Sequence, residues 1–367
     1  MKKIILAVFI LIFVFAVPAK AELYSEQYEK SGAESLYDAL PDETKDLLDR
    51  LEITPKNSDF VNKITTGNIF TLIIDIIKSE GKIPAVTALS VLGIVLAVAA
   101  LKNFGGKSEN DMLLSYIATI AVAGAALLPL YNVITASART IKAGAQFMLS
   151  FVPIYSTILL SSGKPLTSAA SGALLLGASE GLIALATYVI TPLSVAYLSV
   201  CTCGSLSPVL NVSGLSELYK RAATWSLSLI MTVYLGVLSI QTTVNAAADN
   251  LALKTGKFVI GTFIPVVGGA VSEAVSTVGA CVSLLKSTVG IYGIIAEALI
   301  VIPLVLWLVA WRLSLSVSSS VATLFDCVKI ASLLRAADTA VSFLLSIVLI
   351  CSLAFILSLT VLMFAGG

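Results

Sequence analysis

The stretch from Lys257 to Gly290, KFVIGTFIPVVGGAVSEAVSTVGACVSLLKSTVG, decides how this chain is expected to fold. Its apolar run, Phe258 to Ala270, is 13 residues long, whereas a helix needs about 20 residues to cross a hydrocarbon core of ~30 Å. Pro265 removes a backbone donor and the Gly268-Gly269 pair has free dihedral angles, so a helix is expected to break here. Because lipid cannot satisfy the freed backbone groups, the stretch predicts a re-entrant hairpin that packs on protein or lines a wet cavity. An ordinary kinked spanning helix is the alternative, since membrane helices tolerate Pro and Gly.

The composition is that of a polytopic membrane protein. Of 367 residues, 57% are hydrophobic and only 12% are charged, with a mean hydropathy of +0.98, whereas soluble domains carry about 25% charged residues. The net charge is +1 and the basic residues are scattered, so no electrostatic surface for nucleic acid is predicted. The chain has no His, and its five Cys lie in apolar or near-membrane sequence. We therefore expect small buried cysteines, and neither a metal nor another cofactor.

The N-terminus has the pattern of a secretory signal peptide over residues 1–21. Lys2 and Lys3 precede an apolar run, and the small residues Ala19 and Ala21 mark a cleavage site. An uncleaved first span is the alternative. In either case, residues 22 onward are expected to lie outside the cytoplasm.

An acidic and amphipathic extracytoplasmic segment is expected over residues 22–80. Its leucines recur at roughly helical spacing, which predicts a short amphipathic helical segment in water. Asp42, after Pro41, is the expected helix start, and Thr54 before Pro55 the expected stop. The run NIFTLIIDIIK, residues 68–78, has a polar face and is expected to lie in the membrane interface.

The rest of the chain predicts an all-α membrane domain with about six spanning helices and two short broken segments. The spans are expected at 83–101, 112–131, 169–200, 223–243, 288–311 and 339–363, and the short, re-entrant segments at 146–160 and 258–271. The short segments resemble each other at a spacing of about 112 residues, and both Arg221 and Arg335 are followed by two alanines, which predicts a tandem repeat. The expected domains are a first helical hairpin (81–131), membrane repeat 1 (132–243) and membrane repeat 2 (244–363).

The orientation of the repeats depends on the short segments. If these re-enter without crossing, each repeat contains two crossings and the copies run parallel. Lys102, Lys107 and Arg312 then lie on the cytoplasmic side, as the positive-inside rule favours. If the short segments cross, the chain has eight spans and the sides of its middle loops are reversed.

The candidate functional residues are carboxyl groups near or inside the predicted membrane segments and residues that break the short segments. Glu180 falls inside the third span and Glu297 inside the fifth, where an ionisable group is costly enough to suggest a function. Each could line an aqueous path or, alternatively, fix helix packing through hydrogen bonds. The sequence GASEG at 177–181 is expected to let another helix approach closely. The full set of candidates is Pro153, Glu180, Pro265, Gly268, Gly269, Glu273 and Glu297.

Catalytic motifs are missing from the sequence. It contains no HExxH, no GxSxG, no P-loop and no GxGD pattern of an intramembrane aspartyl protease. We therefore expect that the chain is not an enzyme. Any energy that it uses is expected to come from a partner or from an ion gradient.

The chain resembles the stage III sporulation protein AE family of endospore-forming bacteria. The resemblance is carried by its signal sequence, by the acidic segment that follows it (the acidic lead) and by residues 257–293, KFVIGTFIPVVGGAVSEAVSTVGACVSLLKSTVGIYG. The resemblance extends from the signal to Phe364 and is most specific over FIPVVGGAVSEA. It implies a multi-pass component of the complex that joins the mother cell to the engulfed forespore, in the mother-cell membrane surrounding the forespore. The implied partners are the other membrane proteins of the stage III A complex, a cytoplasmic secretion-type ATPase and ring-forming proteins of the intermembrane space. The likeness of that complex to secretion systems implies a permease-like or export-gate role.

Three functions therefore compete. The chain is expected to be a membrane component of a multiprotein transport channel, and the alternatives are a self-sufficient ion-coupled secondary transporter and an intramembrane enzyme. Broken segments in two repeats fit both transport functions. Parallel copies with only two isolated carboxylates favour the channel component, because a carrier usually has inverted repeats and a cluster of polar groups at the midplane.

Overall fold

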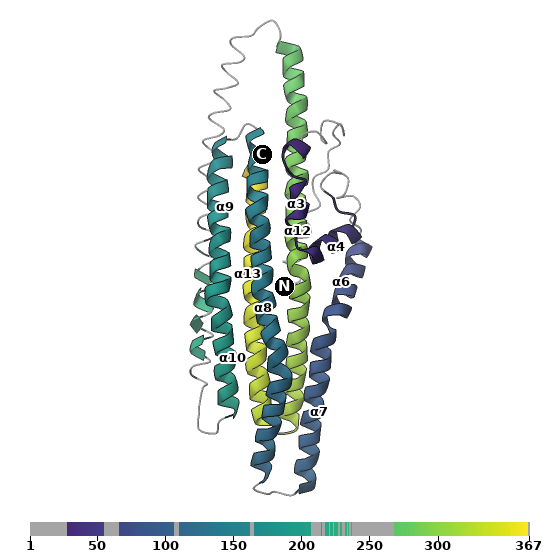
Figure 1. Ribbon diagram of the computed structural model, residues 1–367, viewed down its shortest axis with the longest axis vertical. Helices are drawn as coiled ribbons and strands as arrows, with labels where there is room; N and C mark the ends of the chain where they lie inside the picture. The colour runs from purple at the N-terminus through teal and green to yellow at the C-terminus, as the bar shows by residue number, and fades with distance from the viewer. Residues whose placement is uncertain are drawn as a thin grey trace.

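The structure of the chain is a computed structural model, which describes residues 28–54, 66–105, 110–161, 165–206 and 268–365, with scattered residues between 214 and 236. Figure 1 shows an elongated bundle whose long helices run along its axis. Among the described residues no strand occurs, which confirms the all-α prediction for that part. The continuous helices are α3 (Ser35–Asp38), α4 (Asp42–Arg50), α6 (Thr66–Glu80), α7 (Lys82–Gly105), α8 (Asn110–Ser161), α9 (Pro165–Leu185), α10 (Thr191–Leu206), α12 (Gly268–Leu324) and α13 (Val328–Ala365).

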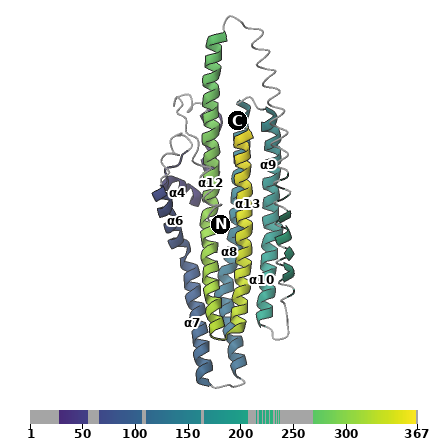
Figure 2. The same ribbon diagram turned by 180° about the vertical axis from the view of Figure 1, so that it is seen from behind.

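Two hairpins have their turns at the same end of the bundle (Figures 1 and 2). One is formed by α7 and α8, and the other by α12 and α13. A third leg packs on α8 and consists of α9, a π-helical turn at Ala186–Ile190 and α10. Pro192 follows the π-turn and has no backbone N–H, which accounts for a local change of helix winding at this place.

Two helices are much longer than one bilayer crossing. α8 has 52 residues and α12 has 57. At ~1.5 Å per residue they are about 78 Å and about 86 Å long, against a hydrocarbon core of about 30 Å. By length and apolar composition, the described residues contain five candidate spans: Lys82–Leu101, Leu113–Ser161, Thr187–Gly204, Ser283–Leu324 and Val328–Met363. Each overlaps an expected span, and the remaining expected span, 223–243, lies mostly outside the described residues.

The first short segment is not broken, which corrects the sequence-based prediction for residues 146–160. These residues are the last turns of α8, which stays helical through Pro129 and Pro153. A proline inside a helix costs about 3 kcal/mol. The neighbouring side chains of Phe151 and Tyr155 are fully buried, and burying two aromatic side chains outweighs that cost.

The second short segment, 258–271, lies mostly outside the described residues. α12 is described from Gly268, and Gly268, Gly269 and Glu273 are helical in it. Pro265 and the signal peptide predicted at 1–21 lie outside the described residues. A re-entrant hairpin at 258–271 and the tandem repeat stay predictions.

Contacts between helices show which segments lie at the same level of the bundle. Ser314 Oγ on α12 donates to the backbone oxygen of Pro84 at the start of α7. Near this level, Arg312 Nε donates to Asp338 Oδ1 on α13, 3.1 Å away. The expected spans 83–101 and 288–311 therefore do not lie side by side.

This level divides the bundle into two halves. The turn half comprises α7, α8 up to Leu130, α12 from Arg312 onward and α13 up to Asp338. The lead half comprises the remainder of α8, α12 and α13, together with α3, α4 and α9.

The acidic lead, described over residues 28–54 and containing α3 and α4, packs on the bundle and is not a separate segment in water. α4 begins at Asp42, as predicted, and the chain turns after Arg50, where Glu52 has a φ of 53°. Leu36 and Leu48 are fully buried, and they belong to one apolar core with α8 and α12. The amphipathic pattern is thus confirmed, and its apolar face is covered by protein.

Candidate functional site

α8 and α12 approach each other closely at two glycines in the lead half. A Cβ atom on Gly144 of α8 would lie 2.6 Å from Glu297 Oε1 of α12. A Cβ atom on Gly293 of α12 would lie 2.4 Å from Phe151 Cε2 of α8. Each helix thus uses a glycine to admit a large side chain of the other, which is how small residues let helix backbones approach.

Three aromatic side chains on one face of α8 line this crossing. Phe147, Phe151 and Tyr155 recur at every fourth position, share one face of the helix and are fully buried. The ring centroids of Phe147 and Phe151 are 5.8 Å apart, and those of Phe151 and Tyr155 are 5.3 Å apart. Tyr155 Oη donates to the backbone oxygen of Lys286 on α12, 3.2 Å away. The row keeps the two helices in a fixed register.

Glu297 is the ionisable group enclosed at this crossing. Its side chain is 0% exposed, and neither carboxyl oxygen has a hydrogen-bond partner among the described residues. Cys351 on α13 and Tyr234 lie within its electrostatic range. Tyr234 Oη is itself bound to the backbone oxygen of Ala354, 3.0 Å away. A buried carboxyl without a partner is costly, so this position is a candidate for function.

The chemistry that this arrangement offers is limited to one titratable carboxyl. In the part of the chain that the structure describes, no group of three His, Cys, Asp or Glu side chains could hold a metal ion. Gly144 lies against Glu297, and the Cys351 thiol and the Tyr234 phenol are its described titratable neighbours; neither is a strong general base. The crossing is therefore suited to binding a proton or to fixing helix packing.

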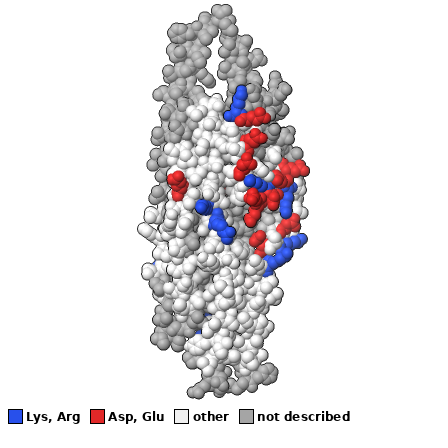
Figure 3. All heavy atoms as spheres, viewed as in Figure 1, with Lys and Arg blue, Asp and Glu red and all other residues white. Residues whose placement is uncertain are grey.

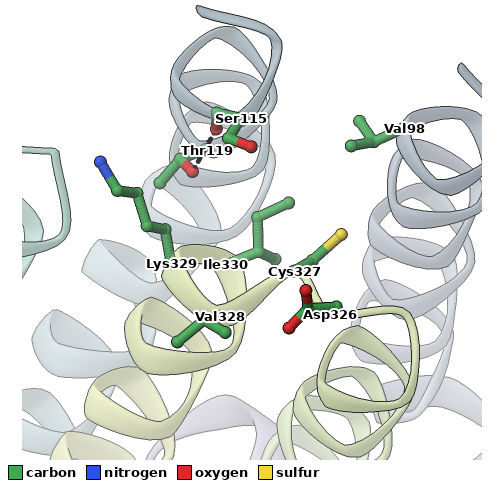
Figure 4. A pocket seen from close by; sticks show the side chains of 8 residues that line it. All are labelled: Val98, Ser115, Thr119, Asp326, Cys327, Val328, Lys329 and Ile330. Carbon is green, nitrogen blue, oxygen red and sulfur yellow. Dashed lines mark hydrogen bonds between the residues drawn. The ribbon is translucent and has the colours of Figure 1, made fainter. Parts of the chain in front are cut away.

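A small cavity of about 190 Å³ lies in the turn half, between α7, α8 and the α12–α13 turn (Figure 4). Lys329 Nζ lies 3.3 Å from the centroid of the Tyr116 ring, which is a cation–π contact. In Figure 4 the Lys329 ammonium extends toward α8 and away from Asp326 and Cys327. The lining groups thus do not converge on a common point, and this cavity is the weaker candidate.

Of the residues singled out from the sequence, only Glu297 belongs to the crossing. Pro153 is exposed on α8, and Glu180 is exposed on α9. Glu180 and Glu297 are not brought together. Gly268, Gly269 and Glu273 are described only as backbone of α12, and Pro265 lies outside the described residues.

Sequence reasoning missed the residues that make the crossing. The close approach expected at Gly177 and Gly181 is not seen, because no atom of the described residues lies within 4 Å of a Cβ built on either one. Gly290 and Gly293 occupy such an approach instead, since a Cβ on Gly290 would lie 3.1 Å from Met363 Sδ. The spacing of these two glycines along α12 was the available signal.

Comparisons with known proteins identify relatives of this chain. The family described as stage III sporulation protein AE matches residues 52–366. The stage III sporulation protein AE of Bacillus subtilis (strain 168) is 26% identical over 242 residues, which cover 66% of this chain and 61% of that protein. The chain thus matches about 61% of the length of this curated relative. No solved structure matches the chain.

Proposed function

Since the chain belongs to the stage III sporulation protein AE family, we propose that it is a permease-like or export-gate-like component of the mother cell to forespore transport channel. It contains apolar helices long enough to cross a membrane. In this proposal it lies in the mother-cell membrane that surrounds the forespore, with its mature N-terminus outside the cytoplasm. It is not an enzyme, and it draws on its partners for energy.

The observation that carries this proposal is the length of α8 and α12. Both helices exceed a bilayer crossing by tens of ångströms. A component of a channel between two membranes needs surfaces outside its own bilayer to contact proteins in the space between them. The half of each helix that does not fit into one bilayer can supply such a surface.

The proposed partners follow from the family. They are the other membrane proteins of the stage III A complex, a cytoplasmic secretion-type ATPase and ring-forming proteins of the intermembrane space. The ATPase would contact the cytoplasmic end of the bundle and the ring proteins the opposite end.

Compartment-specific complementation tests this function. A strain without the gene is expected to engulf the forespore and then fail to form heat-resistant spores. Expression of the full chain from a mother-cell promoter should restore spores, whereas expression from a forespore promoter at the same level should not. Normal spore formation without the gene, or rescue from the forespore, would overturn the proposal.

A self-sufficient ion-coupled transporter remains the second candidate, and Glu297 is the observation that favours it. A carboxyl enclosed in a helix bundle is a common device for coupling transport to protons. Proton uptake by the purified chain in liposomes separates the two functions. A carrier should move protons with a solute without partners, whereas a channel component alone should leave the liposomes as tight as protein-free ones.

A further inference from the structure

We infer that the turn half is the part of the bundle that lies in lipid, and that the lead half, with the Gly144 and Glu297 crossing, projects from the membrane on the side of the acidic lead. This inference rests on the membrane character of the chain and not on its transport role. The proposed interaction surface is a belt of apolar side chains around the turn half. Its partner is the acyl chains of one bilayer.

α7 gives the thickness of the belt. Its candidate span, Lys82–Leu101, has 20 residues, which is one crossing of a bilayer. Glu80 and Lys82 stand at its start and Lys102 follows its end, with no charged residue between Ile83 and Leu101. Charged groups at both ends of an uncharged helix mark the two interfaces.

Large exposed apolar side chains concentrate at the level of α7. On α7 they include Val86 and Leu89, and on the first half of α8 they include Ile117, Ile120 and Leu128. Among the α12 side chains that the structure describes, from Ser283 onward, the exposed large apolar residues begin at Val309 and include Leu313 and Val317, which lie beside α7. An outward-facing apolar surface shared by three helices is what lipid contact requires.

Most exposed charged side chains lie in the other half; in the turn half, Asp326 and Arg335 are exposed near the α12–α13 turn. Arg139 and Lys142 on α8 and Glu180 on α9 are exposed, and the acidic lead packs at the same level on α12. In Figure 3 the charged residues gather on the lead half of this face, and the described surface toward the turn end is white. Placing the lead half in lipid would expose these charges to hydrocarbon.

The charged residues of α13 within the turn half each have a partner, as embedded charges require. Lys329 lies on the ring of Tyr116, and Arg335 Nη2 donates to Thr323 Oγ1, 2.9 Å away, near the turn. Asp338 is paired with Arg312 at the boundary between the halves. All three thus contact a protein group, and for Lys329 this contact is the Tyr116 ring, since its Nζ makes no hydrogen bond among the described residues.

Hydropathy alone would place residues 288–311 and 339–363 in the bilayer instead. Their apolar character has another cause, because the most apolar windows of α12 and α13 are 56% and 50% buried within the chain, against 33% for α7 and for α8. Apolar residues that protein covers need no lipid. α7, whose apolar window is 33% buried, does.

Depth-dependent quenching of single labelled cysteines tests the inference. In a full-length background with its five native cysteines replaced by Ala, Val317→Cys on α12 and Leu353→Cys on α13 each receive a fluorescent label in liposomes. Both positions are exposed and apolar. We expect nitroxides on the acyl chains to quench the label at residue 317 and aqueous iodide to quench that at residue 353. Lipid quenching at residue 353, or iodide quenching at residue 317, would overturn the inference.

Two further variants extend the measurement to α8 in the turn half and to α4 in the lead half. Ile120→Cys should behave as lipid-exposed and Glu43→Cys as water-exposed. Where the cysteine-free background does not fold, the wild-type chain is photolabelled with diazirines on the acyl chains and adducts are mapped by mass spectrometry. Adducts in 83–101 and 113–131 but not in 345–363 are expected, and adducts in 345–363 would overturn the inference.

Discussion

At the scale of single residues, the α8–α12 crossing depends on glycines, which have no side chain and so leave room for a large side chain of the other helix. Gly293 lies against the Phe151 ring and Gly144 against the Glu297 carboxyl. Neither pair is visible in local periodicity, because the partners are about 150 residues apart in the chain and only packing brings them together. The sequence could identify Glu297 as an ionisable residue inside an apolar segment. It could not identify Gly144, which lies against it.

The variant Gly293→Ala is predicted to destabilise the bundle. Its new methyl group would overlap Phe151 Cε2, 2.4 Å away, and such overpacking costs about 1–3 kcal/mol. Gly181→Ala is the matched control, because no described atom lies within 4 Å of the new Cβ and Ala favours a helix by about 1 kcal/mol over Gly. Thermal unfolding in detergent, followed by circular dichroism, measures both. A Gly293→Ala variant as stable as Gly181→Ala would contradict the close approach.

Glu297→Gln is predicted to stabilise the fold by about 1–3 kcal/mol, because it keeps the shape of the side chain and removes a buried ionisable group. Glu297→Leu should be at least as stable, since no described donor would lose a partner. Denaturant unfolding measures the change, and a loss of stability in both variants would show that the carboxyl has a partner.

The channel function predicts that both Glu297 variants form spores normally at normal protein levels. A block of spore formation in both would support the ion-coupled carrier.

At the scale of elements, the acidic lead is predicted to be a docked part of the bundle. Leu48 is fully buried in the core shared with α12, and replacing a buried Leu by Ala costs about 2–5 kcal/mol. Leu48→Ala should therefore release α3 and α4, which hydrogen exchange detects as lost protection in residues 33–53. Asp46→Ala changes an exposed residue of α4 and should keep the protection. Rapid exchange of α4 in the wild-type chain would show that the lead is free.

The docking of α6 is predicted to weaken as pH rises. Burial, and then the nearby Glu43 carboxylate, raise the pKa of Glu80 above its ordinary value of 4.5. Because the folded state favours the protonated form, its extra stability is present below pH 4.5 and is lost as pH rises through the raised pKa. Protection of α6 from hydrogen exchange, corrected for intrinsic rates, should fall over this interval. Glu80→Gln should remove the pH dependence, and an unchanged profile in that variant would contradict the assignment.

The elements that could be predicted are those with a local signal. The start of α4 at Asp42 follows from Pro41, and the buried Leu36 and Leu48 follow from their spacing. The continuity of α8 could not be predicted, because Pro153 breaks a helix unless its neighbours are well packed. Phe151 and Tyr155 supply that packing only through contacts with α12.

At the scale of the whole molecule, the position of each helix along the bundle axis could not be predicted from the sequence. Residues 288–311 are apolar whether lipid or protein covers them, and composition does not separate the two environments. The hydrogen bond from Ser314 to Pro84 shows that this segment lies beyond the start of α7 along the bundle. Such a register depends on contacts between residues far apart in the chain, and it changes which surfaces are left for lipid and for partners.

Affinity purification of a tagged, full-length chain from sporulating cells tests most directly whether the chain works within an assembly. In a mild detergent, we predict recovery of a particle that contains the other stage III A membrane proteins, the secretion-type ATPase and the ring-forming proteins. The reciprocal purification through a tagged ring protein, in the same detergent, should recover this chain. Recovery of the chain alone, under conditions in which the tagged ring protein retains its other partners, would contradict the account.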